Sequence, residues 1–220
     1  MVAALEAVAS AAVEQVADFN VIKNLYIMKK STVIILAVVA VVAIYSVVIY
    51  NNLAKASQEV EGAWANVETQ YQRRSDLIPN LVNTVKGYAT HESQTLEGVV
   101  AARAKATSIT VDGANMTPEQ FAAFAEAQND VTSALGRLIA VAENYPELKA
   151  NQNFLELQSQ LEGTENRIAV ERQRYNEIVK AFNKKVVTFP NNLFASMFGF
   201  SKREFFASQQ GADVAPVVEF

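Results

Sequence analysis

The sequence contains no cysteine, one histidine, eight glycines and five prolines in 220 residues. Without cysteine the chain can form neither disulfides nor thiolate metal sites, and a cysteine nucleophile is excluded. The single histidine, His91, has no glutamate three residues before it, so the Glu-x-x-His pairs of di-metal helical bundles are missing. The sequence also lacks the Gly-x-Ser-x-Gly motif of serine hydrolases and any glycine-rich phosphate-binding loop. We therefore expect no catalytic residues, no metal and no cofactor.

What the sequence does contain is one long apolar run, Val33–Tyr50, in which eighteen consecutive residues carry no charge. A helix of about this length crosses the hydrocarbon core of a bilayer. We expect a transmembrane helix over residues 31–52, with the lipid bilayer as its partner. Residues 1–27 form an N-terminal extension ahead of Met28, and two interpretations of it stay open: a misassigned start codon, or a short cytoplasmic tail with little fixed structure.

Charged residues on the two sides of the run predict its orientation. Lys29 and Lys30 lie directly before it, whereas Lys55 is followed by three glutamates within thirteen residues. By the positive-inside rule the N-terminus is cytoplasmic and the rest of the chain is extracytoplasmic. A cleaved signal peptide is the alternative, because Ala54–Ala56 has the small-x-small form of a cleavage site that ends at Ala56. Against it, the run is longer than the usual apolar region of about 7–15 residues.

The apolar residues after the run recur at helical spacing, so residues 53–190 are predicted to form an all-α domain. We expect an antiparallel four-helix-type bundle with long helices over residues 53–75, 78–102, 117–145 and 154–189. Asp76 is predicted to cap a new helix with Pro79 in its first turn, where the missing N–H costs nothing. Thr117 and Gln120 have the spacing of a capping box. The polar and β-branched residues of Thr107–Asn115 predict a loop.

Residues 191–220 form a C-terminal tail rich in phenylalanine. Its large apolar residues are Leu193, Phe194, Met197, Phe198, Phe200, Phe205 and Phe206. Apolar side chains at this density are costly to expose to water, so we expect the tail to pack on the bundle or to touch the membrane surface.

Several short motifs follow one another along the chain. They are Tyr50–Leu53, Ala63–Trp64, Arg73–Val82, Lys86–Ala89 with His91–Glu92, Glu143–Lys149, Tyr175–Asn176, Phe189–Pro190 and a Pro-x-Val-x-Phe ending. In this order they resemble the motifs of the LemA family. The resemblance covers about residue 28 to the C-terminus. It implies a bacterial inner-membrane protein with a single N-terminal span and an extracytoplasmic helical bundle, and it carries over no catalytic residue.

Eight residues of these motifs form the candidate interaction surface: Arg73, Arg74, Asp76, Asn80, His91, Glu92, Tyr175 and Asn176. For the pair Arg73–Arg74 two roles stay open, binding an acidic partner and closing a helix junction. Asp76 and His91 would be about 22 Å apart in a straight helix, too far to act together in catalysis.

The charge balance and the missing catalytic motifs narrow the function. Residues 53–220 carry 16 Lys and Arg against 20 Asp and Glu without a basic block, so no nucleic-acid partner is expected. We predict a membrane-anchored, non-enzymatic module of the bacterial envelope that binds an unidentified envelope protein. Two alternatives remain: a scaffold that assembles with itself, and a ligand-binding or enzymatic module that uses the Arg73–His91 region.

Overall fold

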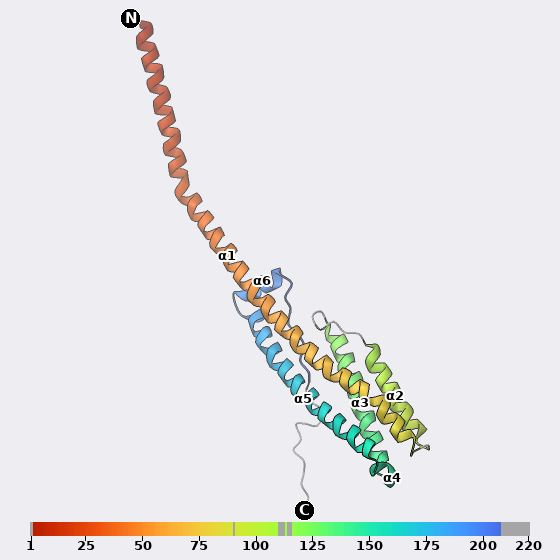
Figure 1. Cartoon of the computed structure of the whole chain (residues 1–220). Helices are drawn as coiled ribbons and strands as arrows, with labels where there is room; N and C mark the ends of the chain where they lie inside the picture. Colours follow the sequence, from red (N-terminus) through yellow and green to blue (C-terminus); the bar gives the residue numbers. More distant parts are fainter. Residues whose placement is uncertain (1, 90, 110–112, 114–115, 208–220) are drawn as a thin grey trace, which may run out of the picture. The chain divides into compact units, whose positions relative to one another are not determined.

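The computed structural model describes residues 2–89, 91–109, 113 and 116–207, and for residues 2–29 and 31 it describes the backbone alone. Parts of the predicted loop, residues 110–112 and 114–115, and the end of the predicted tail, residues 208–220, lie outside this range. The chain divides into two units, Met1–Asn51 and Asn52–Phe220. Every regular element in the described ranges is a helix, and no strand occurs there (Figure 1). The all-α prediction is confirmed.

The first unit consists of part of helix α1, which extends over Val2–Lys86. In the described part of the chain, this is the one helix long and apolar enough to cross a membrane. The side chains of the apolar run are largely exposed, as those of a lipid-facing helix are. Residues 2–27, expected to have little fixed structure, are helical. They contain no glycine or proline, so nothing in the sequence interrupts the helix.

The second unit, called the helical unit below, contains the rest of α1 and five further helices (Figure 1). These are α2 (Ser93–Ser108), α3 (Pro118–Ala142), α4 (Pro146–Lys149), α5 (Gln152–Val187) and α6 (Asn191–Met197). One apolar core joins the first five helices of the chain. Its largest members are Ile78, Leu81, Leu96, Leu135, Leu138, Leu148, Phe154 and Leu161.

Helices α1 and α5 run antiparallel in this unit. Arg74 pairs with Glu165 at 2.8 Å, and the rings of Trp64 and Tyr175 lie 5.7 Å apart. Ten residues forward along α1 therefore correspond to ten residues back along α5. Because both helices rise about 1.5 Å per residue, this register extends along both of them.

The helix junction predicted at Arg73–Asp76 is wrong, since α1 passes through it and contains Pro79. Proline has no N–H to donate, so the carbonyl of Ser75, four residues earlier, loses its partner within the helix. Arg103 of α2 replaces that partner: its Nε donates to the Ser75 carbonyl oxygen at 2.9 Å. A hydrogen bond from another helix therefore compensates for the proline.

The helix predicted over residues 78–102 is also wrong, because a turn interrupts it. α1 ends at Lys86, and α2 begins at Ser93. The hydroxyl of Tyr145, which lies between α3 and α4, donates to Glu92 Oε1 in this turn at 3.1 Å. Residues 53 positions apart in the sequence thus meet at the turn.

The helix start predicted at Thr117 is confirmed. Thr117 Oγ1 accepts from the Gln120 N–H at 3.2 Å, and Gln120 Oε1 accepts from the Thr117 N–H at 3.0 Å. α3 ends at Ala142, three residues before its predicted end. α5 runs over Gln152–Val187, two residues earlier at each end than the predicted 154–189.

After α6 the chain reverses direction at Gly199. This residue has a φ of 78°, a conformation that side chains disfavour. Its N–H donates to the Ser196 carbonyl at 3.3 Å, and the N–H of Phe200 donates to the Ala195 carbonyl at 2.9 Å. These are the two bonds of a Schellman motif. The reversal leads residues 201–207, called the tail segment below, back along α5.

Candidate functional site

The guanidinium of Arg74 is buried between three helices and is 2 % exposed. Its Nη1 donates to Glu165 Oε1 at 2.8 Å and to Thr132 Oγ1 at 2.7 Å. Its Nη2 donates to the side-chain and backbone oxygens of Gln128 at 2.6 and 3.1 Å. The guanidinium also lies over the Tyr71 ring, 5.1 Å from its centroid. All these partners belong to the chain itself, so Arg74 is placed to hold α1 against α3 and α5.

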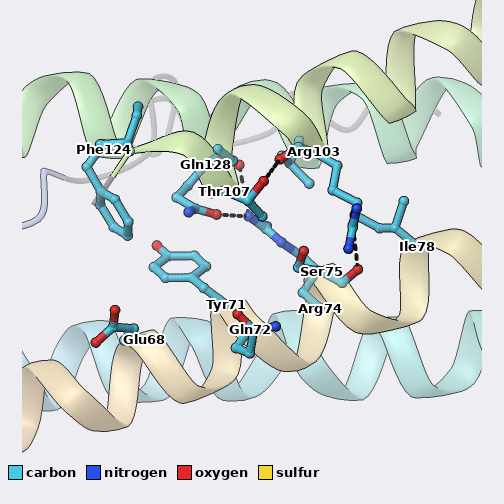
Figure 2. Close-up of a pocket in the computed structure, with 13 residues that line it drawn as sticks. Glu68, Tyr71, Gln72, Arg74, Ser75, Ile78, Arg103, Thr107, Phe124 and Gln128 are labelled. Carbon is cyan, nitrogen blue, oxygen red and sulfur yellow. Dashed lines mark hydrogen bonds between the residues drawn. The ribbon is translucent and has the colours of Figure 1, made fainter. Parts of the chain in front are cut away.

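A cavity of about 120 Å³ lies beside Arg74 (Figure 2). Its walls come from α1, α2 and α3 and include Glu68, Tyr71, Ile78, Arg103, Thr107 and Phe124. Burial raises the pKa of Tyr71, and the nearby guanidinium groups of Arg172 and Arg74 oppose that rise. Both guanidinium groups that line the cavity already have oxygen partners. The cavity has room for a few molecules of the size of water.

Three of the predicted interaction residues lie together on the outer face of α1. Arg73, Asp76 and Asn80 are exposed and line one open groove. Asp76 does not cap a helix; its Oδ1 accepts from the Gln72 amide at 2.7 Å. Arg74, the remaining predicted interaction residue of the Arg73–Val82 motif, is buried and does not belong to this surface.

His91 and Glu92 lie in the turn between α1 and α2. Asp76 is ten residues before the end of α1, which corresponds to about 15 Å along the helix axis. α1 does not fold back at Asp76, so the structure gives no support to a joint role for Asp76 and His91. The eight candidate residues therefore occupy four places: the interior, the outer face of α1, this turn and α5.

On α5, Asn176 binds the backbone of the tail segment. Its Nδ2 donates to the Phe206 carbonyl oxygen at 2.9 Å, and its Oδ1 accepts from the Phe206 N–H at 2.9 Å. Asn183 makes the same pair of bonds with the backbone of Arg203, both at 2.8 Å. The two side-chain amides thus pair with the peptide as a neighbouring β-strand would.

The spacing of these bonds follows from helix and strand geometry. Asn176 and Asn183 are seven residues apart, or about 10.5 Å along a helix. Arg203 and Phe206 are three residues apart, which spans about 10 Å in an extended chain. The match allows Asn183 and Asn176 to bind residues 203 and 206 of a nearly extended peptide that runs antiparallel to α5.

Phe206 adds a side-chain contact to these backbone bonds. Its ring stacks on the Trp64 indole, with centroids 5.8 Å apart and an interplanar angle of 4°. It also lies 4.8 Å from the Phe121 ring and 5.3 Å from the Tyr175 ring. The guanidinium of Arg172 lies over the Phe206 ring at 4.7 Å. Such aromatic pairs contribute about 0.5–1.5 kcal/mol each beyond the burial of their surface.

Tyr175, a predicted interaction residue, is part of the wall of this aromatic pocket and is buried. Burial raises the pKa of its hydroxyl to about 12, with an opposing effect from Arg203 and a reinforcing one from Glu204. The tyrosine is therefore neutral at physiological pH. A groove of about 510 Å³ runs beside the tail segment on the surface of α5, and its walls include Gln173 and Phe205.

Sequence reasoning missed Asn183 and the binding role of Phe206. The available signal was a repeated pair: Tyr175-Asn176 and Phe182-Asn183 place an aromatic residue and an asparagine at the same seven-residue spacing. The aromatic residue of each pair is buried, and the asparagine beside it faces the tail segment.

The contacts at this site hold the chain's own tail segment against α5. The site offers paired backbone hydrogen bonds and an aromatic pocket for one side chain. Among the side chains that the structure describes, no three His, Asp or Glu residues gather where they could hold a metal ion.

The chain is similar to several known proteins. Protein LemA of Metamycoplasma hominis is 27 % identical over 145 residues, which cover 66 % of this chain and 63 % of that protein. Magnetosome protein MamQ 2 of Paramagnetospirillum magneticum is 26 % identical over 203 residues, which cover 84 % of this chain and 74 % of that protein. Magnetosome protein MamQ of Magnetospirillum gryphiswaldense is 24 % identical over 186 residues, which cover 77 % of this chain and 68 % of that protein. Residues 63–220 match the model of the LemA family, and the chain therefore belongs to that family.

Proposed function

We propose that this protein is a membrane-anchored, non-enzymatic interaction module of the bacterial envelope. In this proposal the apolar run crosses the inner membrane with the N-terminus in the cytoplasm, and the helical unit is an extracytoplasmic, antiparallel four-helix-type bundle. The exposed apolar side chains of α1 support the anchor, and Lys29 and Lys30 before the run support the orientation.

The observation that carries the proposal is the pair of asparagines that bind residues 203 and 206. Their bonds go to the backbone, so they demand an extended chain but not a particular sequence. Specificity comes from the aromatic pocket, which accepts the Phe206 ring. The ligand class is therefore an extended peptide segment of another protein with a phenylalanine in register. The tail segment competes for the same site.

A self-assembling scaffold is the second candidate, and the same site favours it. Arg172, Asn176 and Asn183 of α5 bind residues 203–207 of this chain, so they are equally complementary to the tail segment of a second copy. Exchange of tail segments between copies would link them at the membrane.

The enzymatic alternative around Arg73–His91 is not proposed, because the partners of Arg74 are groups of the chain itself. Hydrolysis of a peptide, ester or phosphate substrate by the full-length protein, lost on His91→Ala, would overturn the non-enzymatic proposal.

The test is binding of a labelled peptide with the sequence of residues 201–207 to the full-length protein in detergent, followed by fluorescence anisotropy. Phe206→Ala weakens the contact between the protein's own tail segment and α5. We therefore expect this variant to bind the peptide at least tenfold more tightly than the unchanged protein does. Adding Asn183→Ala removes two backbone bonds and is expected to weaken binding again. A peptide with alanine in place of the second phenylalanine is the matched control.

Each outcome separates the candidates. Failure of the Phe206→Ala variant to bind the peptide, or equal binding of the control peptide, would contradict the proposal. A concentration-dependent dimer of the full-length protein that Phe206→Ala abolishes would favour the scaffold. A photoreactive residue at Gln173, beside the groove, then identifies the partner in cells, with Arg174 as the control about 100° around the helix.

A further inference from the structure

α6 turns a small residue inward and large apolar residues outward. Ala195 is 1 % exposed, whereas Leu193 and Met197 are 61 and 65 % exposed. Phe189, just before the helix, is 75 % exposed. Single apolar residues are common on protein surfaces, but three large ones exposed within nine residues indicate a contact surface. Phe189, Leu193 and Met197 are called the apolar patch below.

The apolar patch lies at the end of the helical unit where the chain arrives from the apolar run. The antiparallel register of α1 and α5 places Leu53 opposite Val186, and both are buried. Leu53 is three residues beyond Tyr50, the last residue of the run, and Phe189 is three residues beyond Val186. The register therefore places the patch near the first residues of α1 in the helical unit, which follow the predicted span directly in the sequence.

The residues around the patch are basic. Residues 178–203 contain Lys180, Lys184, Lys185, Lys202 and Arg203 and no aspartate or glutamate, although the chain as a whole has a net charge of −4. On the facing part of α1, Lys55 is accompanied by Glu59 and Glu61. The local excess of positive charge is complementary to anionic lipid headgroups.

We propose that the apolar patch rests on the surface of the bilayer that the apolar run crosses, with the surrounding lysines at anionic headgroups. Interfacial segments bind in this way, with apolar side chains at the boundary between headgroups and acyl chains and basic residues among the headgroups. The tail then has two roles: Phe206 packs on the helical unit, and the apolar patch contacts lipid. The contact limits the orientations of the helical unit relative to the membrane.

The absence of cysteine allows a direct test with single-cysteine variants. Leu193→Cys and Met197→Cys place a fluorophore in the patch. Val170→Cys is the matched control, because it is equally exposed at 62 % on α5 and lies about 25 Å along the helix from Val187. The labelled full-length protein is reconstituted in vesicles of phosphatidylcholine and phosphatidylglycerol that contain lipids with a quencher near the headgroup.

We expect the lipid quencher to lower the emission at residues 193 and 197 at least twofold more than at residue 170. Equal quenching at the three positions would overturn the proposal. A label at residue 193 that is shielded from aqueous iodide but not quenched by lipid would show that protein covers the patch, and would also overturn it. Vesicles of phosphatidylcholine alone should give weaker quenching, and an unchanged value would refute the role of the lysines. All three substitutions are at exposed positions, and Trp64 emission checks the fold.

Discussion

Replacing Arg74 with alanine tests whether one buried guanidinium holds α1, α3 and α5 together. The variant loses four hydrogen bonds and leaves Gln128 and Thr132 without their donor. Removing one partner of a buried ion pair costs about 3–5 kcal/mol, because the remaining charge is left buried and unpaired. Glu165 is 35 % exposed and can stay hydrated. We therefore expect the low end of that range, a loss of about 3 kcal/mol in the free energy of unfolding.

The assay is urea unfolding of the full-length protein in detergent, followed by tryptophan emission. Trp64 is the only tryptophan and is buried among four aromatic rings, so its emission reports on the helical unit. Arg73→Ala is the matched control, since that neighbouring arginine is exposed and its loss should change the free energy of unfolding by less than about 0.5 kcal/mol.

Two results would refute this reasoning. A loss below about 1 kcal/mol for Arg74→Ala would mean that its hydrogen bonds add no more than one ordinary bond does. An unchanged free energy of unfolding for Glu165→Gln would show that the buried guanidinium needs no counter-charge. We expect Glu165→Gln to cost about 3 kcal/mol, because it leaves the Arg74 guanidinium, which is 2 % exposed, without the carboxylate charge, although the amide still accepts a hydrogen bond.

Two further predictions use the same unfolding assay. Arg103→Met leaves the Ser75 carbonyl without a donor and should cost about 1–3 kcal/mol. Adding Pro79→Ala returns an N–H to that carbonyl, so the double variant should regain most of the loss, and no recovery would disprove the compensation. Burial raises the pKa of Tyr175 from 10.0 to about 12 in the folded state. Between pH 10 and pH 12 the folded state thus keeps a proton that the unfolded state loses. The contribution of the neutral Tyr175 hydroxyl to stability is complete below pH 10 and is lost as the pH rises toward 12. Between pH 10 and pH 12, the free energy of unfolding of Tyr175→Phe should therefore fall by up to about 2 kcal/mol less than that of the unchanged protein. Parallel pH curves for the two proteins would contradict this.

The sequence by itself determined those features that depend on residues close to one another in the chain. The eighteen uncharged residues of Val33–Tyr50 predict a span whatever the rest of the chain does. The capping box at Thr117 and Gln120 involves groups three residues apart, and it forms as predicted. The long helix before Phe189 follows from helical spacing alone. Such features need no knowledge of which helices become neighbours.

Only the tertiary structure decided the features whose partners are distant in sequence. Pro79 predicted a helix start, and α1 continues through it because Arg103, 28 residues from Ser75, supplies the missing donor. Arg74 is buried because Glu165, 91 residues away, lies opposite it. Asn176 binds backbone because the chain reverses at Gly199 and returns along α5. A buried polar group is stable only when a partner is in place, and packing alone determines which partner that is.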